Sequence, residues 1–171
     1  MDFKTYVHQV PDFPKPGFLF RDITPLLVDA KAFSLAVEAM AAPVTTLQPT
    51  HVLGLESRGF IFGSALAQRL GLGFVPARKP GKLPGATIRE TYQTTDGSED
   101  ALEIVKDAFK PGDRVLVVDD VLATGGTAVA ARTLVERTGA QAIALTLFVE
   151  VDELPGREKL KGMPVFSVVR D

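Results

Sequence analysis

Two adjacent carboxylates and a glycine-rich turn follow a run of apolar residues in the second half of the chain. Val115–Val118 has the unbroken apolar, valine-rich pattern of a strand that is buried on both faces of a parallel sheet. Asp119 and Asp120 come at its carboxyl end, and the turn Ala123–Thr127 opens a helical stretch from Ala128. Because a helix start offers free N–H groups and a positive dipole end, we predict an anion site at this turn.

The turn consists of residue types that suit a phosphate. Glycines let the backbone approach a ligand closely and adopt positive φ, and threonine hydroxyls can donate hydrogen bonds to phosphate oxygens. Its members are Ala123, Thr124, Gly125, Gly126 and Thr127. The carboxylates of Asp119 and Asp120 would repel a phosphate, and suit instead ribose hydroxyls or a Mg²⁺ ion that a polyphosphate brings with it. The combination predicts a ligand with a sugar in the middle and a phosphate at one end.

The composition is that of one compact domain. The chain has 171 residues, of which 46% are hydrophobic and 23% charged, and this is enough for one full core. A net charge of −2 without a basic run argues against a nucleic-acid partner. There is no cysteine, and His8 and His51 cannot make a metal site alone. No stretch resembles a signal peptide or a membrane span, so we expect a cytoplasmic protein without a membrane partner.

Predicted strands and helices alternate along most of the chain. We expect a doubly wound parallel sheet flanked by helices, with ligands at the carboxyl ends of the strands. The predicted strands are 51–55, 74–77, 115–118, 142–149 and 165–169, and the predicted helices are 30–47, 58–70 and 128–137.

Two segments do not fit this alternation. Pro11–Pro25 holds four prolines, so it is predicted to be a stiff, non-helical cover over the edge of the sheet. Lys79–Asp100 is rich in glycine, proline and charge, and is predicted to be a long loop that acts as a lid.

The segment 115–127 resembles the phosphoribosyl pyrophosphate (PRPP) binding motif of type I phosphoribosyltransferases. In that family the acidic pair contacts the ribose, the next loop holds the 5-phosphate, and Mg²⁺ is bound with the diphosphate. The resemblance therefore gives Asp119 and Asp120 the ribose role and 123–127 the phosphate role. It also implies a single domain over 1–171, with an amino-terminal hood at about 1–27 and a lid at about 79–100.

Three further segments resemble the adenine-specific branch of this family, and they come in the family's order. They are Phe13–Pro25, Gly54–Gly63 and Arg78–Gly85. With the PRPP motif, the resemblance extends from about Asp12 to Val149. It implies adenine as the base, a homodimer, and a base site formed by the hood. The base-binding residues are then Leu19, Phe20 and Arg21, although Phe18–Phe20 could also serve only to fill core.

A second group of residues is suited to diphosphate. Arg58 follows a buried strand and can offer a bidentate fork, and the backbone amide of Ser57 can add a donor. Arg78, Lys79 and Lys82 add positive charge, or else form a solvated basic turn. A nucleophile-elbow interpretation of Ser57 is disfavoured, because Leu55 stands where that motif needs glycine.

The lid departs from the family pattern Tyr-x-Leu-Glu-Tyr-Gly, since this chain has Thr95 and Asp96 in place of the glutamate and second tyrosine between Tyr92 and Gly97. The departure leaves three alternatives: Asp96 or Glu99 substitutes, the enzyme is slower, or its base differs.

The function implied is transfer of ribosyl 5-phosphate from PRPP to adenine, with Asp119, Asp120 and Arg58 as catalytic residues. Two alternatives stay open, which are another purine base (hypoxanthine, guanine or xanthine) and a non-catalytic regulator that binds PRPP or a nucleotide.

Overall fold

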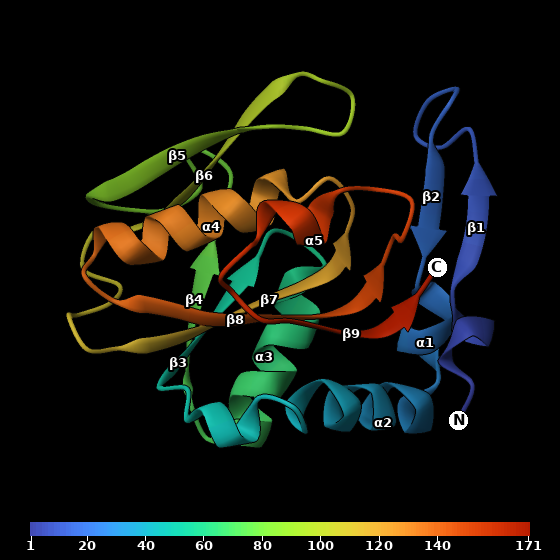
Figure 1. The fold of residues 1–171 in the computed structure, drawn as a ribbon, viewed down its shortest axis with the longest axis horizontal. Coiled ribbons are helices and arrows are strands. Elements are labelled where there is room, and N and C mark those ends of the chain that lie inside the picture. The colour runs from blue at the N-terminus through green and yellow to red at the C-terminus, as the bar shows by residue number, and fades with distance from the viewer.

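Five parallel strands form the centre of the computed structural model, which describes residues 1–171 (Figure 1). Their spatial order is β4 (Gly73–Ala77), β3 (His51–Leu55), β7 (Arg114–Leu122), β8 (Gln141–Glu150) and β9 (Val165–Arg170). The chain order reverses between β3 and β7. Open sheets of this kind bind ligands outside the carboxyl ends of the strands at such a reversal. The predicted doubly wound parallel sheet is confirmed.

Helices cover both faces of this sheet (Figure 1). On one side lie α2 (Ala30–Ala41) and α3 (Gly59–Leu70), and on the other lie α4 (Gly126–Arg137) and the short α5 (Gly156–Lys159). The remaining helical segments are η1 (Phe3–Tyr6), α1 (Thr24–Val28) and η2 (Thr45–Leu47). None of the helices has the length and apolar character needed to cross a membrane.

The alternating side chains of β7 supply two separate hydrophobic clusters. Val115 and Val117 belong to the cluster beneath α4, and Leu116 and Val118 belong to the one beneath α2 and α3. All four side chains are inaccessible to solvent. This explains the unbroken apolar run in the sequence, because a strand covered on both faces has no polar side.

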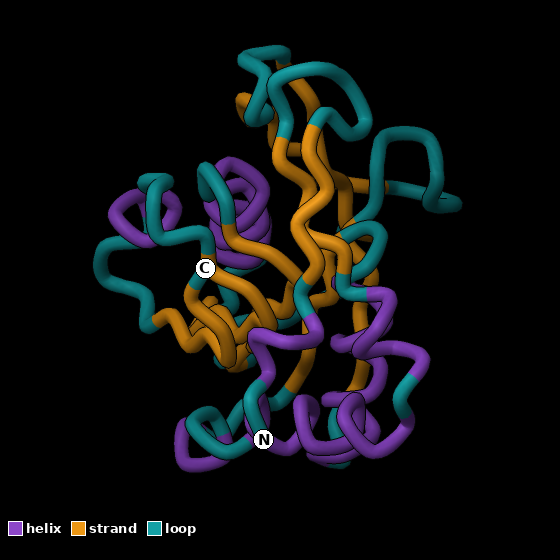
Figure 2. Tube along the Cα trace, turned by 90° about the vertical axis from the view of Figure 1, so that its right-hand side faces the viewer, coloured by secondary structure: helices purple, strands orange, loops and turns teal.

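The amino-terminal hood is a two-stranded antiparallel ladder of β1 (His8–Pro11) and β2 (Leu19–Asp22). Figure 2 shows its strands rising away from the helices toward loops at one end of the molecule. The prediction that Pro11–Pro25 contains no helix is wrong at its end, because α1 starts at Thr24. Pro25 fits there since proline in the first turn of a helix loses no hydrogen bond.

The predicted loop at 79–100 is largely an antiparallel hairpin of β5 (Thr87–Gln93) and β6 (Glu99–Val105). Its tip turns at Gly97, which has a φ of +82°. Leu102 and Ile104 are fully buried and belong to the cluster that also contains α4 side chains. The hairpin therefore has a packed face, and only its tip and the segment 79–86 lack regular structure.

Other boundaries also differ from prediction. The helix expected over 30–47 ends at Ala41, because Pro43 cannot continue it, and η2 follows. Strand β7 extends to Leu122, so Asp119 and Asp120 lie inside the strand rather than after it, and α4 starts at Gly126 rather than Ala128.

We expect Phe62→Ala to destabilise the fold by about 3–5 kcal/mol, because Phe62 is fully buried and stacks on Phe148 at a centroid distance of 5.8 Å. Urea unfolding measures this change. The matched control is Phe13→Ala, which removes a ring that is 50% exposed. Equal midpoints for the two variants would contradict the assignment of Phe62 to the core.

Candidate active site

A cavity of about 840 Å³ opens at the carboxyl ends of the strands, beside the reversal in strand order. This volume is within the usual range for small-molecule sites. Five parts of the chain line it: the hood, the start of α3, the hairpin tip, the segment from β7 into α4, and the loop between β8 and α5. The predicted residues Leu19, Phe20, Arg21, Arg58, Tyr92, Asp96, Asp119, Asp120 and 123–127 are all among its lining residues.

The Arg58 guanidinium group contacts both the hood and β7. Its Nε lies 2.7 Å from Oδ2 of Asp120, and one of its terminal nitrogens donates a 3.1 Å hydrogen bond to the carbonyl oxygen of Arg21. The same group lies 4.6 Å from the centre of the Phe20 ring, which is within cation–π range. Arg58 therefore holds one residue of each of two predicted subsites.

The two carboxylates on β7 differ in their surroundings. The Asp120 side chain is 9% exposed, and its Oδ2 accepts no hydrogen bond, because the nearby Arg58 N–H is not aligned on it. Oδ1 of Asp119 accepts the backbone N–H of Asp120 at 2.9 Å. Burial, and then the adjacent Asp120 charge, raise the pKa of Asp119 well above its ordinary value. The pair thus offers an unused buried acceptor that a hydroxyl group can satisfy.

Glycines bring three backbone segments together around the predicted phosphate turn. Gly125 has a φ of +81°, as predicted for a phosphate cradle, and a Cβ there would lie 2.8 Å from the carbonyl oxygen of Gly156. A Cβ on Gly126 would lie 2.5 Å from the carbonyl oxygen of Gln93 at the end of β5. No side chain caps α4, so the first N–H groups of this helix remain available to a ligand.

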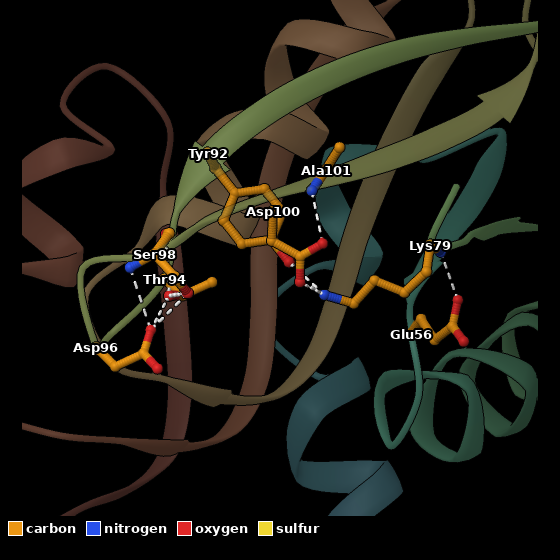
Figure 3. A network of polar contacts seen from close by, with 8 residues as sticks. All are labelled: Glu56, Lys79, Tyr92, Thr94, Asp96, Ser98, Asp100 and Ala101. Atoms are coloured by element: carbon orange, nitrogen blue, oxygen red, sulfur yellow. Dashed lines mark hydrogen bonds and ion pairs between the residues drawn. The ribbon is translucent and has the colours of Figure 1, made fainter. Parts of the chain in front are cut away.

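The hairpin tip and the hood meet over the cavity. Lys15 of the hood loop forms an ion pair with Asp96, whose other oxygen accepts hydrogen bonds from Thr94 and Ser98. Figure 3 shows Thr94 and Ser98 directed at Asp96 in the tip. The hydrogen bond from Lys15, followed by those from Thr94 and Ser98, holds the pKa of Asp96 far below its ordinary value.

The other basic residues predicted to bind diphosphate lie outside this cavity, as does Ser57, which is exposed. Lys79 pairs with Asp100 and donates a 2.8 Å hydrogen bond to the Tyr92 hydroxyl, as Figure 3 shows. Arg78 donates to the carbonyl oxygen of Lys82 at 3.3 Å, so it belongs to the turn that follows β4.

Glu56 had no predicted role, and the structure places it between two loops. Its Oε2 accepts the backbone N–H of Lys79 at 2.6 Å (Figure 3). The same oxygen lies 3.5 Å from Nε of Arg78. This carboxylate therefore joins the end of β3 to the segment that leaves β4.

The loop between β8 and α5 was missing from the predicted site. Its residues Val151, Glu153 and Leu154 line the cavity. A signal was available, because this loop leaves the carboxyl end of the strand next to β7, and such loops surround the ligand in open parallel sheets.

Carboxylates and histidines do not gather into a metal site of their own, since no group of three or more His, Cys, Asp or Glu side chains could hold an ion. Oxygen atoms are nevertheless the ligands that Mg²⁺ prefers, and the β7 carboxylates present them at the cavity. These residues fit an ion that brings most of its ligands with it.

Comparison with known proteins decides the family. A family model described as "Phosphoribosyl transferase domain" matches residues 27–169. The chain belongs to this phosphoribosyl transferase family. The adenine phosphoribosyltransferase of Carboxydothermus hydrogenoformans is 54% identical over 170 residues, which cover 99% of each chain.

Solved structures of phosphoribosyl transferases match the whole fold, including the hood and the hairpin. Adenine phosphoribosyltransferase from Rhodothermus marinus superposes with a TM-score of 0.94 at 47% identity, covering 99% of this chain and 96% of that one. The Saccharomyces cerevisiae enzyme gives a TM-score of 0.91 at 41% identity, covering 98% and 97%. Its structure is a complex with adenine and D-2,5-dideoxy-2,5-imino-altritol 1,6-bisphosphate.

We expect Asp96→Asn to loosen the contact between lid and hood, because the amide cannot replace the charge that pairs with Lys15. Faster amide hydrogen exchange at residues 94–98 measures this change at neutral pH. A lowered pKa means that the Asp96 contact persists above the unfolded value of about 3.9 and is lost as the pH falls through the folded value. The wild-type tip should therefore loosen only in acid, and equal exchange in both proteins at pH 7 would contradict this closure.

Proposed function

We propose that this phosphoribosyl transferase is a purine salvage enzyme that transfers ribosyl 5-phosphate from PRPP to N9 of adenine. The products are AMP and diphosphate. The observation that carries the proposal is the shared cavity, in which a phosphate-type turn, the carboxylates of Asp119 and buried Asp120, and the hood face one space. The names of relatives that are about half identical over the full chain support adenine as the base.

The phosphate end is the turn before α4. Uncapped N–H groups at the start of a 12-residue helix attract an anion through both hydrogen bonds and the helix dipole. Thr124 and Thr127 add hydroxyl donors at the lining of the cavity. We assign the 5-phosphate to residues 123–127.

The ribose end is the acidic pair. Oδ2 of Asp120 is ion-paired with Arg58 but accepts no hydrogen bond, so it can accept one from a ribose hydroxyl. Negative charge beside the ribose also favours the positive charge that develops on the sugar ring as the C1–O bond breaks. Asp119 and Asp120 therefore both bind the ribose and stabilise the positive charge of the transition state.

The leaving group is diphosphate, and it carries away the electron pair of the broken C1–O bond while N9 of the base forms the new bond and gives up its proton. Arg58 lies at the cavity and is the basic side chain in position to stabilise that charge. Mg²⁺ bound with PRPP would neutralise further charge on the diphosphate, near the β7 carboxylates.

Ser57, Arg78, Lys79 and Lys82 stay predictions as diphosphate ligands. In this closed arrangement Lys79 is held by Asp100 and Tyr92, so it can reach a diphosphate only after the hairpin moves. The homodimer implied by the family would offer these residues a second route, toward the cavity of the partner. A homodimeric state and a cytoplasmic location likewise stay predictions from the sequence.

The base end is the hood. The Phe20 ring meets Phe13 edge-on at 5.1 Å and has the Arg58 guanidinium group over it, so a purine would stack against a ring that is already fixed. Stacking of this kind contributes about 1–3 kcal/mol per base. Backbone groups of Leu19–Arg21 would then read the edge of the base.

Turnover of PRPP and Mg²⁺ against adenine, hypoxanthine, guanine, xanthine and uracil tests the proposal. We expect diphosphate release and nucleotide formation with adenine alone, because its amino group needs an acceptor where a 6-oxo purine needs a donor. Release with hypoxanthine or guanine instead would assign another base. Binding of PRPP without turnover of any base would point to a regulator.

We expect the double variant Asp119→Asn, Asp120→Asn to lower turnover on the order of a hundredfold or more while keeping the fold. Asp119→Asn alone should also raise stability at neutral pH. Its raised folded pKa means that ionisation opposes folding as the pH rises above the unfolded value of about 3.9. Steady-state rates and urea unfolding measure the two effects, with exposed Asp107→Asn as the control. A double variant with wild-type rates would contradict the ribose role.

A further inference from the structure

Arg21 lines the cavity, and its guanidinium group ties β2 to the far edge of the central sheet. Its Nε donates a 3.0 Å hydrogen bond to Oδ2 of Asp171, and a terminal nitrogen donates to the carbonyl oxygen of Leu19 at 3.0 Å. Only 10% of the Arg21 side chain is exposed. The guanidinium group therefore braces the backbone of the segment Leu19–Arg21 from behind.

Asp171 is a firm anchor for this group because its backbone extends the central sheet. Its N–H donates to the carbonyl oxygen of Glu150 at 2.9 Å, and its own carbonyl oxygen accepts from Asp152 at 2.9 Å. Its carboxylate also accepts two 3.0 Å hydrogen bonds from the Gln9 amide on β1. One carboxylate thus contacts both strands of the hood, and Figure 1 shows this carboxyl end of the chain beside the base of β2.

The hood needs such an anchor because hydrophobic burial does not hold it. All four residues of β1 are exposed, and no residue of β2 is buried. A two-stranded ladder is marginally stable by itself in water. The polar contacts to Asp171, to Arg58 and to Asp96 are what fix the hood over the cavity.

We propose that Asp171 is a positioning residue for the base. Through its contacts with Arg21 and Gln9 it fixes where the backbone of Leu19–Arg21 lies relative to the cavity. The proposal rests on the proposed function, in which these hood residues bind adenine. Arg21 is held from both sides, with its side chain bound by Asp171 and its carbonyl oxygen bound by Arg58. Loss of Asp171 should therefore affect the base and leave the PRPP end unchanged.

Asp171→Ala tests this in the full chain. We expect the KM for adenine to rise about tenfold, the loss typical of a hydrogen bond to a charged group, while the KM for PRPP stays within twofold. The matched control is Asp152→Ala, which removes a neighbouring carboxylate that pairs with Arg170 and does not contact the hood. Asp171→Glu should restore part of the adenine affinity.

A double-variant cycle tests the route through Arg21. If Asp171 acts mainly through this side chain, Asp171→Ala should raise the adenine KM much less when it is added to Arg21→Ala than in the wild-type chain, and the remaining rise is the share carried by Gln9. If the two substitutions instead raise the adenine KM independently of each other, the route through Arg21 is overturned. Equal rises in both KM values, or no change in either, would overturn the proposal. If Asp171→Ala does not fold, Asp171→Asn removes only the charge, and the adenine KM should then rise about threefold.

Amide hydrogen exchange of β1 and β2 gives a readout that needs no activity. It should be faster in Asp171→Ala than in wild type, and unchanged in Asp152→Ala. An inactive wild-type chain would refute the proposed function, and the exchange of the hood would still test the anchor. Activity with adenine together with unchanged hood exchange in Asp171→Ala would refute the anchor alone.

Discussion

The contact between Arg58 and Asp120 is the interaction on which the rest of the site depends. Asp120 is buried at the end of β7, and an ionised carboxylate in such a place costs several kcal/mol unless a charge compensates it. Arg58 supplies that charge from the start of α3, and another of its N–H groups holds the hood carbonyl of Arg21. Because one guanidinium group serves both partners, the proposed ribose end and the proposed base end keep a fixed separation.

Close backbone packing is the steric counterpart of this electrostatic constraint. A Cβ on Gly59 would lie 2.9 Å from Oδ1 of Asp119, so glycine is what lets α3 start next to the acidic pair. Gly126 allows the same approach between the phosphate turn and the end of the hairpin. The cavity is shaped by positions without side chains as much as by the side chains that line it.

The sequence predicted those parts whose signal is local. The run Val115–Val118 forms a buried strand as its pattern indicated, and the acidic pair and the glycine turn that follow it line one cavity. The hairpin was missed because Thr87–Gln93 alternates exposed and half-buried residues without a strong apolar signal. The contacts of Lys79 could not be predicted from the sequence, because its partners Tyr92 and Asp100 come together only through the pairing of β5 with β6.

The lid residues that depart from the family pattern can be compared with what proton transfer requires. A group that moves a proton works best when its pKa is near the working pH, and it needs a free oxygen. Asp96 has neither, because Lys15, Thr94 and Ser98 occupy its carboxylate and hold its pKa far below the ordinary value. We therefore propose that in this closed arrangement Asp96 substitutes for the family's lid residues in closure and not in proton transfer. A closed lid excludes the water that would otherwise capture the activated ribose, so this contact protects the reaction without entering it.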